Sequence, residues 1–155
     1  MELLWSFPPW SGWEVEIFAT DLSTRALGRA RAGIWPAEKA SAISPRYLKA
    51  FMLRGVGTRG GKIAAGPELR SVIRFARVNL SDATWPAGGP YDAIFCRNVL
   101  IYFSRSRKQD ILTRMAATLS PGGFLLLGAS ESLSALADRF EMVRHGGAVL
   151  YRLRA

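Results

Sequence analysis

Polar side chains follow directly after an apolar run in the second half of the chain. The run is Tyr91–Cys96, with Arg97 and Asn98 immediately after it and Tyr102 a few residues further on. Near-continuous apolar runs are typical of strands in parallel sheets, which are covered on both faces. Ligands of such sheets bind beyond the carboxyl ends of the strands. We therefore expect Arg97, Asn98 and Tyr102 to meet a ligand or reacting group; alternatively, Asn98 forms a turn and Arg97 is a solvated charge.

Two other predicted strands also end in polar residues. Residues 14–20 alternate in the manner of a strand, and Asp21 follows them. An acidic residue in this position accepts hydrogen bonds from ribose hydroxyls in doubly wound folds, although Asp21 could instead cap the next helix. The strand predicted at 72–78 ends at Asn79 and Leu80. For Asn79 the alternative is a turn-forming role.

The remaining pattern predicts the elements that position these residues. A helix is expected at 24–32, with Ser23 or Asp21 as its cap and Gly33 at its end. The stretch 36–52 predicts two helical pieces separated at Ser44-Pro45, and a glycine-rich turn then leads into Lys62–Ala65. A helix at 105–119 precedes a buried strand at 124–127, a short helix at 133–138, and a hairpin formed by 140–144 and 148–152. This order predicts an α/β fold whose sheet is mostly parallel with an antiparallel edge.

Composition narrows the classes of chemistry. The 155 residues fit one domain, and they include one cysteine, Cys96, and one histidine, His145. An intramolecular disulfide is therefore excluded, a Cys/His zinc site lacks ligands, and we expect no metal. Cys96 is expected to be a small buried apolar residue rather than a nucleophile. Without an apolar run of bilayer-spanning length or a basic N-terminal region, we expect a cytoplasmic protein that does not insert into membranes.

The positive charge is concentrated in one part of the chain. The formal net charge is +9, and residues 25–77 carry twelve Lys and Arg against two Glu. Such a segment suits an anionic partner, whether an acidic protein, a membrane surface or a nucleic acid. Arginine supplies 17 of the 21 basic residues, so compositional bias is the alternative explanation. Aromatic residues do not alternate with the basic ones, which makes a nucleic-acid partner the less favoured choice.

Several segments together resemble one family, the chemotaxis receptor (protein-glutamate) methyltransferases called CheR. They are ATDLS (19–23), FMLRGVG (51–57), PELR with IRFARVNL (67–80), YDAIFCRNVLIYF (91–103) and LSPGGFLLLGASES (119–132). The resemblance covers about 14–155. It implies a class I, Rossmann-like domain that binds S-adenosylmethionine and methylates glutamate side chains on the cytoplasmic domain of chemoreceptors. It also implies that about 40–66 is an inserted β-subdomain that docks receptor tails, and it leaves 1–13 as an irregular N-terminal segment.

The resemblance also assigns roles to the strand-end residues. It implies that Asp21 binds the ribose hydroxyls and that Asn79 and Leu80 contact the adenine. Arg97 and Asn98 are implied to lie beside the cofactor near the reacting centre, and Tyr102 to line the methyl-transfer site. Arg97 and Tyr102 are thus the expected catalytic residues. An ionised glutamate can attack the sulfonium methyl directly, so that holding the atoms in line is the main requirement.

The chain departs from the family pattern at its N-terminus. The N-terminal helical domain and the first strand with its glycine-containing loop are expected to be missing. If Leu3–Trp5 formed that strand, only residues 6–14 would connect it to the next one, which is too few for a parallel crossover. Ala129 also stands where the family often has His. The alternative function is therefore a docking module with impaired cofactor binding, and a nucleic-acid-directed methyltransferase is a weaker one.

Overall fold

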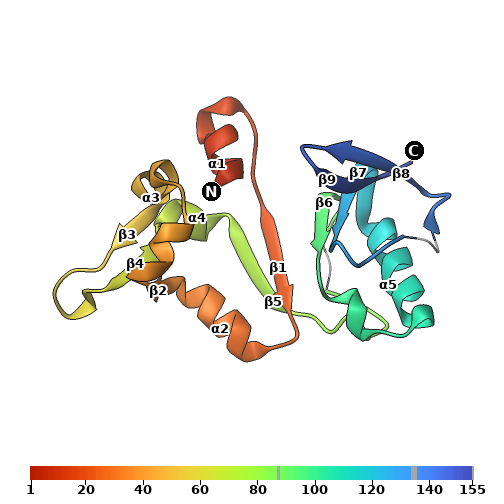
Figure 1. Cartoon of the computed structure of the whole chain (residues 1–155), viewed down its shortest axis with the longest axis horizontal. Helices are drawn as coiled ribbons and strands as arrows, with labels where there is room; N and C mark the ends of the chain where they lie inside the picture. Colours follow the sequence, from red (N-terminus) through yellow and green to blue (C-terminus); the bar gives the residue numbers. More distant parts are fainter. Residues whose placement is uncertain (87, 134–135, 155) are drawn as a thin grey trace. The chain divides into compact units, whose positions relative to one another are not determined.

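The computed structural model describes residues 1–86, 88–133 and 136–154. Two compact units divide the chain: the first unit is Met1–Asn79 and the second unit is Leu80–Ala155. Figure 1 shows the first in red to yellow-green and the second in green to blue. Each is described by itself below. No helix in these described ranges is both long and apolar enough to cross a membrane.

The first unit contains the strand–helix pair that the sequence predicts. β1 (Ile17–Asp21) runs parallel to β5 (Ile73–Arg77), and Asp21 pairs with Arg77 at the end of the register. The helix α2 (Thr24–Ala32) starts after Ser23, whose side chain accepts a hydrogen bond from the Ala26 N–H at 3.2 Å. It ends at Gly33, which has the left-handed conformation (φ 60°) that glycine adopts without steric cost.

A small antiparallel sheet is inserted between α2 and β5. Its strand order is β2 (Ile34–Pro36), β4 (Lys62–Ala65), β3 (Met52–Arg54). The two predicted helical pieces are η2 (Ala37–Ala42) and α3 (Pro45–Phe51), the second starting at the proline of Ser44-Pro45. The turn η3 (Gly57–Arg59) joins β3 to β4, and α4 (Pro67–Ser71) leads into β5. Because β2 belongs to this sheet, the sheet starts earlier than the predicted range of about 40–66.

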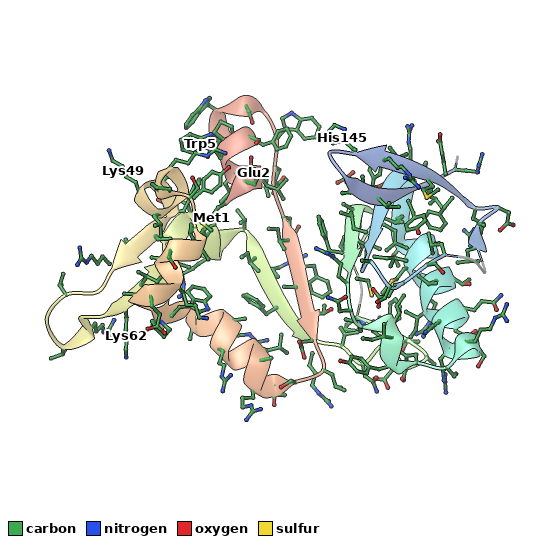
Figure 2. All side chains as sticks on the ribbon, viewed as in Figure 1. Met1, Glu2, Trp5, Lys49, Lys62 and His145 are labelled. Atoms are coloured by element: carbon green, nitrogen blue, oxygen red, sulfur yellow. The ribbon has the colours of Figure 1, made fainter. Side chains whose placement is uncertain are left out.

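The N-terminal segment contains a helix where a short strand was considered. α1 (Glu2–Ser6) is followed by η1 (Pro9–Ser11), so the strand interpretation of Leu3–Trp5 is wrong. The helix is held by distant side chains: the rings of Trp5 and Tyr47 lie 5.8 Å apart, and the Tyr47 hydroxyl donates a hydrogen bond to Glu2. The Arg46 guanidinium lies 4.5 Å from the centre of the Tyr47 ring. Figure 2 shows Glu2 and Trp5 on α1 close to α3. Contacts with α3 therefore favour a helix in a segment whose own pattern is ambiguous.

The second unit contains a mixed sheet with strand order β6-β7-β9-β8. β6 (Tyr91–Cys96) and β7 (Leu119–Leu127) are parallel, whereas β8 (Phe140–His145) and β9 (Ala148–Leu153) form the predicted antiparallel hairpin. β7 starts at Leu119, earlier than predicted, so Ser120–Gly123 belong to the strand rather than to a loop. The parallel pairs and the antiparallel edge confirm the predicted α/β class. The short helix predicted at 133–138 includes residues 134 and 135, which lie outside the described residues.

The core of the second unit is packed between α5 (Arg105–Thr118) and the sheet. One face of α5 is buried, with Ile111 fully inaccessible and Leu112 2% exposed. It meets Leu125 of β7, which is also fully inaccessible, and Phe140 of β8. The Ser104 side chain accepts a hydrogen bond from the Arg107 N–H, which fixes where the helix begins. The carboxyl ends of β6 and β7 are therefore supported by a close-packed layer.

The first strand of each parallel pair has a single strand neighbour. In the ranges that the structure describes, β1 pairs with β5 alone and β6 pairs with β7 alone. No strand precedes β1 in those ranges.

We expect Leu125→Ala to lower the free energy of unfolding of the second unit by about 2–5 kcal/mol, because it leaves a cavity between α5 and the sheet. The matched control is Met142→Ala on β8, since Met142 is 56% exposed and its loss should cost no more than about 0.5 kcal/mol. Urea denaturation followed by circular dichroism measures both. Equal losses in the two variants would contradict this location of the core.

Candidate functional site

Three of the residues predicted to meet a ligand, Arg97, Asn98 and Tyr102, lie on one short segment after β6. Arg97 and Asn98 come directly after the strand and are exposed, and Asn98 has a left-handed backbone (φ 59°). Tyr102 is the last residue of η4 (Leu100–Tyr102) and is 82% exposed. Leu100, at the start of η4, is only 2% exposed and anchors the segment in the core. The segment thus presents three polar side chains to solvent from a buried support.

A single carboxylate holds the backbone of this segment. Glu131 accepts hydrogen bonds from the N–H groups of Asn98 (2.8 Å), Val99 (3.0 Å) and Leu100 (2.7 Å), and from Gly128 N–H (2.7 Å). Its side chain therefore joins the loop after β7 to the loop after β6. Because the two strands are parallel neighbours, their carboxyl ends adjoin and one side chain reaches both loops.

The space between the two loops requires glycine at position 128. A Cβ atom there would lie 2.6 Å from Asn98 Oδ1 and 2.7 Å from Glu131 Oε2. It would also lie 3.0 Å from the Asn98 backbone nitrogen. Gly128, which directly follows β7, is thus needed for the close approach of the two loops.

The electrostatics of Glu131 favour its charged form. Burial raises its pKa, but the N–H groups of Gly128, Asn98, Leu100 and Val99 lower it more, so that the pKa lies below its usual value. Glu131 is 9% exposed. It therefore remains a carboxylate at neutral pH within a buried setting.

Cys96, the last residue of β6, lies beneath the segment and is not activated. It is 5% exposed, and burial together with the charge of Glu131 raises the pKa of its thiol to about 11. A thiol with this pKa is a poor nucleophile near neutral pH. The prediction that Cys96 is a small buried apolar residue is confirmed.

Arg114, a residue that the sequence did not single out, holds the loop that contains Leu80. Its guanidinium donates hydrogen bonds to the carbonyls of Leu80 (2.8 Å) and Asp82, and it lies 4.2 Å from the centre of the Trp85 ring. Leu80 and Trp85 are partly buried against the core of the second unit. Leu80 is thus fixed in place from α5.

Asp21 and Asn79 lie in the first unit, at the carboxyl end of its parallel strand pair. Asp21 Oδ1 accepts a hydrogen bond from the Ser23 N–H at 2.7 Å, and its carbonyl accepts one from Val78 N–H at 3.1 Å. Asp21 therefore forms a turn before α2, whereas the cap of α2 is Ser23. Asn79 follows β5 by two residues and so comes from the same end of the strand pair as Asp21.

The structure thus arranges the predicted residues as two sets. Asp21 and Asn79 form one in the first unit, and Leu80, Arg97, Asn98 and Tyr102 belong to the second. Glu131 and Arg114, which hold the second set in place, were not predicted as site residues. The sequence feature that could have identified Glu131 is its position three residues after Gly128, the glycine that follows a strand. In the described part of the chain no group of three His, Cys, Asp or Glu could hold a metal ion.

We expect Glu131 to contribute stability that depends on pH. Its folded pKa is below its unfolded value of about 4.3, so its contribution is complete above that value and is lost as the pH falls through the folded pKa. The difference in unfolding free energy between wild type and Glu131→Gln should therefore be largest near pH 7 and shrink below pH ~4. Chemical denaturation at several pH values measures it, and Glu141→Gln at an exposed position is the control. A difference that does not vary with pH would contradict the lowered pKa.

Comparison with known proteins now identifies the family. A family model described as CheR methyltransferase, SAM binding domain, matches residues 1–148. The chemotaxis protein methyltransferase of Salmonella typhimurium is 39% identical over 127 residues, which are 82% of this chain and 44% of the relative. Chemotaxis protein methyltransferase 2 of Pseudomonas aeruginosa is 38% identical over 151 residues, 97% of this chain and 51% of the relative. The chain spans about half the length of the curated relatives it matches.

Solved structures support the fold. The N-methyltransferase NodS of Bradyrhizobium japonicum in complex with S-adenosyl-L-homocysteine has a TM-score of 0.54 at 15% identity, over 90% of this chain and 67% of that one. A second structure of NodS gives a TM-score of 0.52 at 16% identity, over 90% of this chain and 74% of that one. At these identities the likeness concerns the fold, which is that of a methyltransferase. The family match, which extends over nearly the whole sequence, shows that the chain belongs to the CheR methyltransferases and corresponds to their SAM-binding domain.

Proposed function

We propose that the chain is the cofactor-binding and methyl-transferring part of an enzyme that methylates glutamate side chains on the cytoplasmic domains of chemoreceptors. The observation that carries the proposal is the exposed segment Arg97-Asn98 at the carboxyl end of β6, held from below by Glu131, in a chain of this family. The same family membership supports a place of action in the cytoplasm.

The strand-end residues suit S-adenosylmethionine. Asp21 uses one carboxylate oxygen for Ser23 and is exposed, so it has acceptor capacity left for ribose hydroxyls. Asn79 and Leu80 are assigned to the adenine, where Leu80 supplies an apolar contact. Arg97 and Asn98 are assigned to the region beside the reacting centre.

The backbone N–H groups of the segment after β6 are already hydrogen-bonded, and this favours a ligand without phosphate. Successive backbone N–H groups in a turn normally form an anion-binding concavity. Here the N–H groups of Asn98, Val99 and Leu100 already bind the Glu131 carboxylate. A phosphate would find these donors occupied, whereas a cofactor with a cationic sulfonium has no need of them.

The reaction needs positioning more than acid–base catalysis. When bound, S-adenosylmethionine supplies an electrophilic methyl group. The receptor glutamate, ionised at neutral pH, forms the new oxygen–carbon bond as the carbon–sulfur bond breaks, and the electron pair remains on sulfur. We assign Tyr102, which is 82% exposed, to the path of the incoming carboxylate. Arg97 is assigned to attract that anion, so that both residues would serve alignment.

The small sheet of the first unit is the proposed docking surface for the receptor. Its strands and flanking helices carry exposed basic side chains, which are Lys39, Arg46, Lys49, Arg54, Arg59 and Lys62. Glu38 is the one acidic residue of the segment 34–66. A surface of this charge suits a partner rich in glutamate.

A second candidate function, a docking module that does not bind cofactor, is favoured by one observation. Within the described residues, β1 and β6 each lack a neighbour on one side. Receptor binding by a folded chain that gives no heat with cofactor would support this candidate over the enzyme.

We expect Asp21→Asn to weaken binding of S-adenosylhomocysteine about tenfold. The amide keeps an acceptor for the Ser23 N–H but loses the charge that strengthens hydrogen bonds from ribose hydroxyls. Isothermal titration calorimetry of the full chain measures this, with Asp110→Asn on the exposed face of α5 as the control. Wild-type affinity in the Asp21 variant would remove Asp21 from the site.

Charge reversal at the small sheet should weaken receptor binding. We expect Arg54→Glu on β3 to reduce the affinity for a purified chemoreceptor cytoplasmic fragment about two- to fivefold at low salt, as for a single exposed ion pair. Arg144→Glu on β8 makes the same change at an exposed strand position in the second unit and should have no effect. Surface plasmon resonance at two salt concentrations tests both, and equal losses would assign the effect to net charge alone.

A further inference from the structure

The turn after β6 depends on a side chain that lies far away in the sequence. Asn98 has φ 59°, a left-handed conformation that costs energy for residues other than glycine, although asparagine tolerates it better than most. The N–H groups of Asn98, Val99 and Leu100 all donate to Glu131, more than 30 residues later. Glu131 is therefore the group that compensates the strained backbone at this point.

This backbone decides where the functional side chains point. Arg97 and Asn98 leave the chain at the strained turn itself, and Tyr102 stands at the end of η4, whose first residue Leu100 is one of the donors to Glu131. A change in the turn would swing the Arg97 and Asn98 side chains and shift the start of η4. Displacements of this kind reduce reaction rates strongly when catalysis rests on alignment.

We infer that Glu131 is a positioning residue for methyl transfer, fixing the directions of Arg97, Asn98 and Tyr102 without touching cofactor or substrate. The inference rests on the proposed function. Glu131 is 9% exposed and uses both of its oxygens on backbone N–H groups, so its role is exerted through the loop it holds. Gly128 belongs to the same arrangement, since a side chain there would push apart Asn98 and Glu131.

Two substitutions separate the effect of the charge of Glu131 from the effect of its side-chain length. Glu131→Gln keeps the size, but its amide nitrogen is a donor and must face N–H groups that are also donors. Glu131→Asp keeps the charge, but its side chain is one methylene shorter and reaches fewer of the donors. Glu141→Gln on β8 is the matched control, because it removes the same charge at an exposed position of the same unit.

The experiment is isothermal titration of the full chain and its variants with S-adenosylhomocysteine, with thermal unfolding recorded in parallel. We expect the Kd to rise about tenfold or more in Glu131→Gln, to rise less in Glu131→Asp, and to stay unchanged in Glu141→Gln. The titration also gives the fraction of binding-competent molecules. A residue that is merely structural would lower that fraction and the melting temperature but leave the Kd of the folded molecules unaltered.

The outcomes distinguish the positioning role of Glu131 from the proposed function. Binding by wild type together with an unchanged Kd in both Glu131 variants overturns the positioning role and leaves the proposed function standing. A folded wild type that gives no heat overturns the proposed function and the positioning role with it. If Glu131→Gln does not fold, the Kd of Glu131→Asp decides: a raised value supports positioning and a wild-type value overturns it.

Discussion

The arrangement at the carboxyl ends of β6 and β7 depends on one buried carboxylate. Removing an ionised group from water is costly, and Glu131 offsets this cost with four backbone N–H groups, each hydrogen bond to a charged group being worth about 1.5–3 kcal/mol. The donors come from two loops that have no strand pairing of their own. One interaction therefore satisfies backbone groups, ties the loops together and sets the strained conformation of Asn98.

The packed layer beneath gives this interaction its rigidity. Leu100 and Leu133 flank the two loops, and they are 2% and 3% exposed. Both belong to the cluster formed by α5 and the sheet. Arg114 of α5 also donates hydrogen bonds to the carbonyls of Leu80 and Asp82. The second unit thus fixes its loops with groups of opposite charge. The Glu131 carboxylate accepts hydrogen bonds from backbone N–H groups after β6 and β7, and the Arg114 guanidinium donates hydrogen bonds to backbone carbonyls before β6.

The fold and the site differ in how far local sequence predicts them. The strand at 91–96, the helix at 24–32 and the hairpin around Gly146-Gly147 were predicted correctly, because hydrophobic period, caps and turn residues are local signals. The helix at Glu2–Ser6 was missed because its stability comes from contacts with Tyr47, far along the chain. Glu131 was missed for a similar reason: its donors are brought to it by the parallel pairing of β6 with β7, and only that pairing distinguishes it from an ordinary loop glutamate.

The choice of an ionised, internally bonded carboxylate also fits chemistry that proceeds by alignment. The thiol beneath the segment has a pKa of about 11, and the single histidine ends β8, so the segment after β6 does not rely on a group that titrates near neutral pH. The lowered pKa of Glu131 keeps its charge constant across the same range. A loop held by a group that changed its charge near pH 7 would change shape with small changes in pH. A loop held by Glu131 keeps one geometry, and a fixed geometry is what the proposed direct transfer from a methyl sulfonium to a carboxylate would require.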